Sequence, residues 1–273
     1  MTWHIVSIFI FSSFSLPAAD FPCHYSSPQS QLGPSTEKLA LDIQTATNKI
    51  IKGTQPEFYK KFLNSNGLLI KGSQKVSDTS LARASETLNK MLGKRADIRN
   101  NLIDKKADIV IIAPSENYCS FPETEELKGT KTFDGRDFCE ICGAGGNEGR
   151  PITAICEDNL LKTKKDPYFG SEDILTHELA HTIHILGMNE STKKRLNELY
   201  NIAKRNNLFA KNKNGEATYV MANDEEFFAC LSAVWFGAHN PKSTAFPPEL
   251  RDRDSIRQIS PLIYEFLKEI YPE

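Results

Sequence analysis

The run from Leu175 to His184 constrains the fold of this chain more than any other stretch of its sequence. It contains the pattern His177-Glu178-x-x-His181, and residues four apart lie on one face of an α-helix, so both histidines can direct a ring nitrogen at one metal ion. Glu178 lies beside that face and could take a proton from a metal-activated water. Its apolar neighbours indicate a half-buried helix. The alternative is a surface helix with a local cluster of His and Glu.

A hydrolytic Zn²⁺ site takes three protein ligands and keeps one position open. One known pattern places a third histidine ten residues after the first, but that position is Gly187 here. His184 follows His177 by seven residues, nearly two helical turns, which is too far for both to bind one small tetrahedral ion. We therefore expect His184 to pack near the site without binding the metal.

A better third ligand lies in the segment Asn223–Cys230, which begins with residues typical of a helix start. Glu225 is expected to face water and complement the helix dipole. Glu226 is followed by two phenylalanines and, about two turns later, by Val234 and Trp235, which together predict deep burial. A buried carboxylate needs a partner such as a cation. We therefore expect Glu226 to complete a Zn²⁺ site.

These residues resemble the lethal-factor-type zinc peptidases, the family of anthrax lethal factor and its secreted relatives. The resemblance is best over residues 130–240 and rests on Asp166-Pro167-Tyr168, Ile174–His184, Tyr219, and Glu226–Ala229 through Trp235-Phe236. It implies an α+β, zincin-like metallopeptidase fold of the gluzincin class. In such a fold a small mixed sheet packs on the active-site helix, and the C-terminal half is helical.

The resemblance also implies roles for individual residues. His177, His181 and Glu226 would bind zinc, and Glu178 would be the general base of a secreted zinc-dependent endopeptidase. Tyr219, seven residues before Glu226, matches the family tyrosine that donates a hydrogen bond to the developing oxyanion. The implied substrate is a peptide or a protein.

One position departs from the family pattern, because Cys230 stands where the family usually has a second Glu four residues after the ligand. Cys230 could form a disulfide that holds its helix, or bind zinc as a thiolate. This difference leaves open a zinc-binding but inactive secreted protein with a binding or toxin-like role. A third interpretation is a secreted, disulfide-stabilised structural protein without a metal.

The N-terminal residues indicate export. The apolar run Ile5–Leu16 ends in Pro17-Ala18-Ala19, as in a secretory signal, although a buried N-terminal strand or helix would also be apolar. We expect a signal peptide over residues 1–19, an extended leader over 20–35 and a single metallopeptidase domain over 36–273. The net charge of −2 argues against a nucleic-acid partner, and no stretch of apolar residues is long enough to span a membrane.

The chain has six cysteines, and an even number in an exported protein favours disulfides, whose pairing the sequence leaves open. The alternative is a zinc knuckle, but a four-cysteine zinc site usually has two close pairs and only Cys139-x-x-Cys142 is close here. The remaining ligands of that knuckle would be Cys119 and Cys156.

Apolar periodicity places strands in the first half of the chain and helices in the second. We expect strands at 67–71, 107–113 and 151–156, and helices at 35–51, 77–93, 172–187, 191–206, 223–237 and 255–270. Residues 115–150 are expected to form a long excursion, a disulfide-linked loop segment between two strands. The strand at 151–156 is a candidate sheet edge for pairing with an extended peptide substrate.

Overall fold

The computed structural model describes residues 55–132, 135–168 and 172–273. All of them belong to one compact unit that spans Gln44–Glu273. The expected signal peptide, leader and first helix lie outside the described residues, as does Cys23. The domain boundary at residue 36 therefore stays a prediction.

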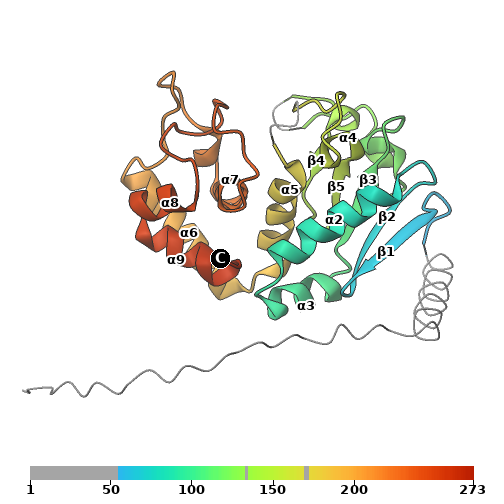
Figure 1. Ribbon diagram of the computed structural model, residues 1–273, viewed down its shortest axis with the longest axis horizontal. Helices are drawn as coiled ribbons and strands as arrows, with labels where there is room; N and C mark the ends of the chain where they lie inside the picture. Colours follow the sequence, from blue (N-terminus) through green and yellow to red (C-terminus); the bar gives the residue numbers. More distant parts are fainter. Residues whose placement is uncertain (1–54, 133–134, 169–171) are drawn as a thin grey trace, which may run out of the picture. The chain divides into compact units, whose positions relative to one another are not determined.

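A mixed five-stranded sheet lies in one half of the described structure (Figure 1). Its strands lie in the order β1-β2-β3-β5-β4, with β2, β3 and β5 parallel and both edge strands antiparallel to their neighbours. The strands are β1 (Lys61–Ser65), β2 (Leu68–Gly72), β3 (Asp108–Ile112), β4 (Gly143–Ala144) and β5 (Ile152–Cys156). The three parallel strands are the ones that the sequence predicted.

The sequence analysis predicted neither edge strand. β1 joins β2 through Asn66 and Gly67, whose φ angles of 52° and 92° are those of a tight two-residue hairpin turn. The Asn-Gly pair is the strongest short-range hairpin signal, and it was present in the sequence. β4 has only two residues, too few to show any alternation of apolar and polar side chains.

The sheet is buried on both faces, which explains the continuous apolar run of β3. Ile109 and Ile111 belong to the larger core beneath the helices. Val110 and Ile112 point to the opposite face, where they pack in a smaller core with aromatic residues of the excursion after β3, such as Phe121. The excursion is therefore a lid over the second face of the sheet.

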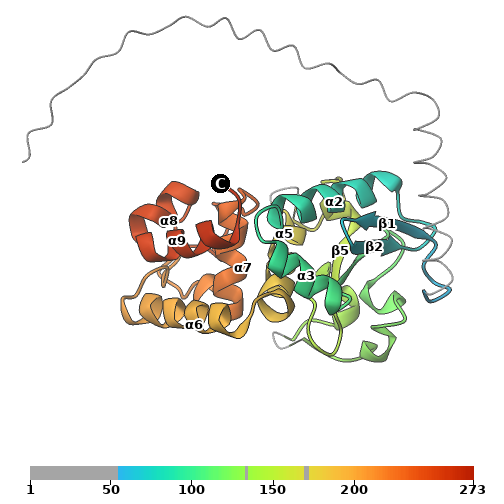
Figure 2. The same cartoon turned by 90° about the horizontal axis from the view of Figure 1, so that it is seen from below.

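The helices form two groups, and α5 (Ile174–Thr182) lies between them (Figure 2). α2 (Asp78–Met91) and α3 (Ala96–Asp104) pack with α5 on the larger core face of the sheet. The C-terminal group consists of α6 (Glu190–Arg205), α7 (Asp224–Trp235), α8 (Arg253–Ile259) and α9 (Pro261–Ile270). The short α4 (Glu157–Leu160) follows β5 directly.

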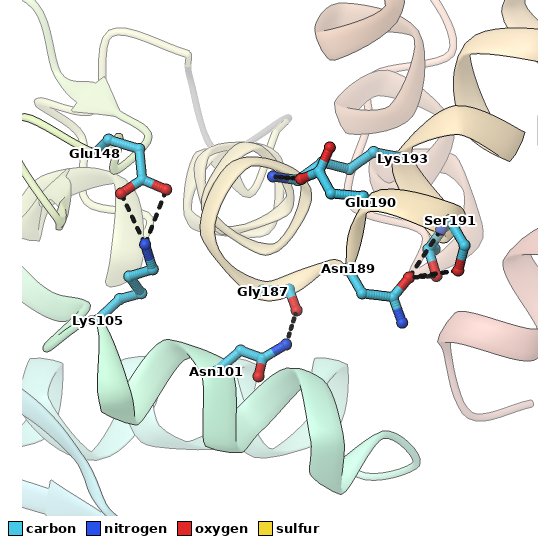
Figure 3. Close-up of polar contacts among 9 residues, drawn as sticks. Asn101, Lys105, Glu148, Gly187, Asn189, Glu190, Ser191 and Lys193 are labelled. Atoms are coloured by element: carbon cyan, nitrogen blue, oxygen red, sulfur yellow. Dashed lines mark hydrogen bonds and ion pairs between the residues drawn. The ribbon is translucent and has the colours of Figure 1, made fainter.

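The C-terminal end of the α5 segment is fixed against α3. α5 continues into a π-helical turn over Ile183–Gly187, and the carbonyl of Gly187 accepts a hydrogen bond from Asn101 Nδ2 at 2.7 Å (Figure 3). Only a glycine allows this approach, since a Cβ at position 187 would lie 2.7 Å from Ile98 Cγ2. Asn189 then caps α6 by accepting from the backbone N–H of Thr192 at 2.9 Å.

Two expectations about the elements were wrong, and one helix was missed. The helix predicted over 255–270 is two helices, because Ser260 is extended (φ −151°) and Pro261 begins α9 without a backbone N–H to continue α8. α3 was not predicted. The proposed substrate edge at 151–156 is an inner strand, since β5 pairs with β3 on one side and with β4 on the other.

Four of the described cysteines form two disulfides, Cys119–Cys139 and Cys142–Cys156. This pairing excludes the zinc knuckle, because its four ligands are consumed in the two bridges. The bridges secure the lid and tie the segment before β4 to the end of β5. Cys230 is a buried free thiol, so the suggestion that a disulfide holds its helix was wrong.

Replacing both Cys119 and Cys139 by serine should destabilise the protein by about 3 kcal/mol, as the bridge closes a loop of 20 residues. Urea denaturation of the variant and of the wild type under non-reducing conditions measures this difference. Denaturation midpoints that coincide would show that the bridge does not stabilise the folded lid.

Candidate metal centre

α5 presents two histidines on one face of the helix because its opposite face packs in the hydrophobic core. Leu175, Leu179 and Ala180 are at most 2% exposed and face the core. Asp173 starts the helix by accepting a hydrogen bond from the backbone N–H of Thr176 at 3.3 Å. His177 and His181 consequently share the face that is turned toward α7.

α7 supplies the third side chain. Asn223 caps this helix by accepting from the backbone N–H of Glu226 at 2.8 Å, which places Glu226 in the first turn. The following residues, Phe227 and Phe228, are at most 1% exposed and anchor the helix in the core. Glu226 is itself buried, whereas the neighbouring Glu225 faces solvent as the sequence analysis expected.

The structure brings one atom from each of these three residues together. The Nε2 atoms of His177 and His181 lie 3.1 Å apart. Oε2 of Glu226 lies 3.2 Å from the first and 3.4 Å from the second. Two ligands at about 2.0–2.1 Å from a tetrahedral zinc ion lie roughly 3.3–3.4 Å apart, so the triangle has the size that a zinc ion requires.

The hydrogen bonding of Glu226 also fits a cation. Its Oε2 atom is buried and has no hydrogen-bond partner within the described part of the chain. The other oxygen, Oε1, accepts a hydrogen bond from the Tyr219 hydroxyl at 2.7 Å. A buried carboxylate oxygen without a donor is destabilising, and a metal ion at the centre of the triangle would compensate it.

The charges of the three residues support the same assignment. Burial alone would raise the pKa of Glu226, but the two histidine rings hold it below its usual value, so the side chain is a carboxylate. Burial opposes protonation of His181, yet the carboxylates of Glu226 and Glu178 outweigh burial and raise its pKa. The site therefore favours positive charge at its centre.

A pocket of about 220 Å³ opens beside this triangle. His177, Glu178 and Tyr219 line it together, so the predicted base and the predicted oxyanion donor lie at one cavity. Tyr219 is 36% exposed, although its partial burial and the bond to Glu226 raise its pKa above the usual value. The sequence analysis missed other lining residues, such as His239 and Phe246, because they follow α7 in a segment without a motif.

The edge strand β4 lies against the histidine-bearing helix. A Cβ at Gly143 would lie 2.9 Å from Cγ of Glu178, and one at Gly145 would lie 2.5 Å from Cβ of His181. These glycines allow β4 and the residue after it to approach α5 more closely than residues with a side chain could. The cluster of glycines over 143–146 was visible in the sequence, but its role depends on contact with a helix thirty residues later.

Two further residues near the triangle do not belong to it. His184 is buried in the π-helical turn, where its ring contacts the ring of Phe228 edge-on at 6.0 Å. Cys230 lies one turn beyond Glu226 and lines the pocket. Burial raises the pKa of its thiol well above the usual value, so it does not supply a negative charge where the resembling family has a Glu.

Replacing Glu226 with Gln should weaken zinc binding by more than about 100-fold, because it removes a ligand and its charge. This effect exceeds the roughly 10–100-fold loss expected when a residue that only orients a ligand is removed. Competition with a zinc-binding dye measures the affinity. Glu225→Gln is the matched control, since it changes an adjacent but exposed carboxylate. Equal affinities of the two variants would contradict the assignment of Glu226 as a ligand.

The burial of His184 predicts a pH-dependent stability. Burial lowers its pKa from 6.5 to about 4, so between these values the unfolded chain binds a proton that the folded chain does not. Stability should therefore fall as the pH is lowered from 6.5 to 4, by up to about 3 kcal/mol from this residue. Urea denaturation with a chelator present, at pH 7 and pH 4, should show a smaller loss for His184→Leu; equal losses would contradict the prediction.

No family model and no curated protein sequence matches this chain. A similar solved structure is that of the Pro-Pro endopeptidase from Paenibacillus alvei, with a TM-score of 0.50 and 18% sequence identity. The match covers 74% of this chain and 97% of that one. At this identity the similarity is one of fold. The chain thus shares its fold with that structure over most of its length.

Proposed function

We propose that the protein is a secreted, zinc-dependent endopeptidase with a zincin-like fold, related to the lethal-factor type. The observation that carries the proposal is the triangle of His177, His181 and Glu226, with contact distances of 3.1–3.4 Å between the facing atoms. The His-Glu-x-x-His pattern and the similarity in fold to an endopeptidase support it. The implied cofactor is Zn²⁺.

Zinc bound in this triangle would supply Lewis-acid activation of a substrate carbonyl and of a water molecule. Glu178 would act as the base, taking a proton from the attacking water and delivering it to the leaving amine. Its position supports this role, since it follows His177 directly and lines the same pocket while remaining partly exposed.

Tyr219 would stabilise the oxyanion that forms on the attacked carbonyl. Its hydroxyl donates to Glu226 Oε1 at 2.7 Å, which places a hydrogen-bond donor directly beside the ligand triangle. To serve the oxyanion, the hydroxyl must exchange the carboxylate for the substrate oxygen. A donor aimed at the place where negative charge develops accelerates acyl transfer more than it strengthens substrate binding.

The substrate would be a peptide or protein segment in extended form. We place its binding edge at β4, because β4 rather than β5 is the terminal strand of the sheet beside α5. An extended segment that pairs with an exposed edge gains backbone hydrogen bonds without any requirement on its side chains. Its scissile bond would then run along the pocket that Glu178 and Tyr219 line.

Export is part of the proposal. Two disulfides among the described residues fit an oxidising environment outside the cytosol. In the same part of the chain, no helix has both the length and the apolar character needed to cross a bilayer.

The second candidate is a zinc-binding protein that hydrolyses nothing. It is favoured by one observation, the neutral thiol of Cys230 at the position where the resembling family has a carboxylate. Both candidates bind zinc, so only turnover separates them. A third candidate, a structural protein without a metal, predicts a zinc content near zero after gentle purification.

Glu178→Gln should abolish cleavage of a quenched peptide library while leaving zinc content unchanged, because the residue moves a proton and does not bind the metal. Fluorescence release by the wild type and the variant, with metal content measured on the same samples, tests this prediction.

The control is Glu190→Gln, which changes an exposed carboxylate on α6. A chelator should inhibit the wild type and this control equally. Zinc-loaded wild type without turnover would point to the inactive candidate, and residual turnover in Glu178→Gln would remove Glu178 from the proposed mechanism.

A further inference from the structure

Glu172 is a partly buried residue of the pocket beside the candidate metal triangle, and the proposed mechanism does not use it. Within the described part of the chain, its carboxylate makes neither a hydrogen bond nor an ion pair, and neither of its oxygens is sealed from solvent. Burial raises the pKa of this carboxyl, and the nearby ring of His177 only partly offsets the rise. A cation that enters the pocket would therefore find an unpaired carboxylate that it can reach.

The charge of Glu172 acts on both sides of the pocket. Burial raises the pKa of the Cys230 thiol and that of the Tyr168 hydroxyl, and the Glu172 carboxylate raises both further. Both of these side chains line the pocket, Cys230 from α7 and Tyr168 from the segment before α5. The carboxylate of Glu172 is therefore directed toward the cavity that these residues line.

Carboxylates outnumber cations among the lining residues that the structure describes. Glu172, Asp173 and Glu178 are acidic, whereas Arg136 is the only arginine of this lining and no lysine belongs to it. A zinc ion in the triangle would not reverse the balance, because Glu226 and Glu178 together match its divalent charge. The pocket of the zinc-loaded protein would consequently keep the carboxylates of Glu172 and Asp173 against one guanidinium.

The charges of Asp173 and Arg136 are already engaged. Asp173 caps α5, where its carboxylate accepts a hydrogen bond from the backbone N–H of Thr176 at 3.3 Å and covers the positive end of the helix dipole. The guanidinium of Arg136 hydrogen-bonds the hydroxyl of Tyr168. Glu172 is thus the lining charge that is left without a partner in the described part of the chain.

The apolar part of the lining suits the stem of a long side chain. Ala233, Ala238 and Ala245 are small and leave room in the cavity of about 220 Å³, and Phe246 adds an apolar surface. Lysine and arginine pack their methylene groups against such surfaces while their charged heads reach a polar partner. The pocket therefore combines an apolar wall with an unpaired carboxylate.

We propose that this pocket receives an arginine or lysine side chain of the substrate next to the scissile bond, and that Glu172 binds its cationic head. Part of the substrate must enter the pocket, because Glu178 and Tyr219 line it as well. A guanidinium can donate two parallel hydrogen bonds to one carboxylate, so arginine should be preferred over lysine. The inference rests on the proposed peptidase function and deepens it by naming the substrate class.

The first test is the cleavage preference of the full chain, purified with zinc, on peptides that carry arginine, lysine, citrulline, leucine or glutamate beside the scissile bond. The peptides are N-acetylated, so that the side chain supplies their only cation. Citrulline is the neutral isostere of arginine, so the arginine-to-citrulline ratio of kcat/KM isolates the effect of the charge. We expect a ratio of about 10 or more, and Glu172→Gln should lower it about 10-fold.

The matched control is Glu225→Gln, which changes an exposed carboxylate that does not line the pocket. This variant should leave the arginine-to-citrulline ratio unchanged, and Glu172→Gln should still cleave the leucine peptide as fast as the wild type does. Preference for citrulline, leucine or glutamate in the wild type, or a ratio that Glu172→Gln does not alter, would overturn the inference while leaving the peptidase proposal intact.

A second readout does not depend on turnover. The NMR signals of N-acetylarginine methylamide should broaden with the zinc-loaded wild type, whereas those of N-acetylcitrulline methylamide should not, and Glu172→Gln should remove the difference. Selective broadening without cleavage of any peptide by the wild type would support the pocket and overturn the peptidase. Neither selective broadening nor cleavage would overturn both.

Discussion

The approach of α7 to α5 is the contact on which the rest of this structure depends. It places the buried Glu226 carboxylate oxygen within 3.4 Å of two imidazole nitrogens. Without a cation, such an arrangement leaves Glu226 Oε2 buried without a donor. The large aromatic residues after Glu226 hold α7 against this penalty, so the hydrophobic core provides the free energy that keeps the three side chains together.

Elements on all sides of α5 limit its position. Gly143 in β4 and Gly145 after it let the sheet edge approach the motif from one side, and Gly187 fixes the end of the following turn on α3. Tyr219 reaches the triangle from the short helical turn before α7 and binds the oxygen of Glu226 that faces away from the histidines. The site is therefore built from segments that are distant in sequence, and each relies on close packing rather than on flexible loops.

The sequence predicted the parts of the site that local patterns encode. The spacing of His177 and His181 follows from the helical period alone, and the burial of Glu226 follows from the apolar residues after it. Contacts between remote segments had no such signal. β5 is an inner strand only because it pairs with the two-residue β4, which the sequence did not reveal. The break at Pro261 was missed because apolar residues continue at helical spacing on both sides of it. No sequence pattern pointed to His239, since it is buried by contacts with remote residues, namely Phe246 and the start of α5.

The bridge between Cys142 and Cys156 has a consequence for where this molecule can work. It ties the residue immediately before β4 to the last residue of β5, and β4 with the residue after it lies against Glu178 and His181. A two-residue strand has little backbone pairing of its own to keep it in position. The surface beside the candidate metal triangle is thus held in shape by a covalent link that reducing surroundings would open. The redox state of the surroundings is in this way coupled to the geometry of the site, and the fold is suited to an oxidising compartment.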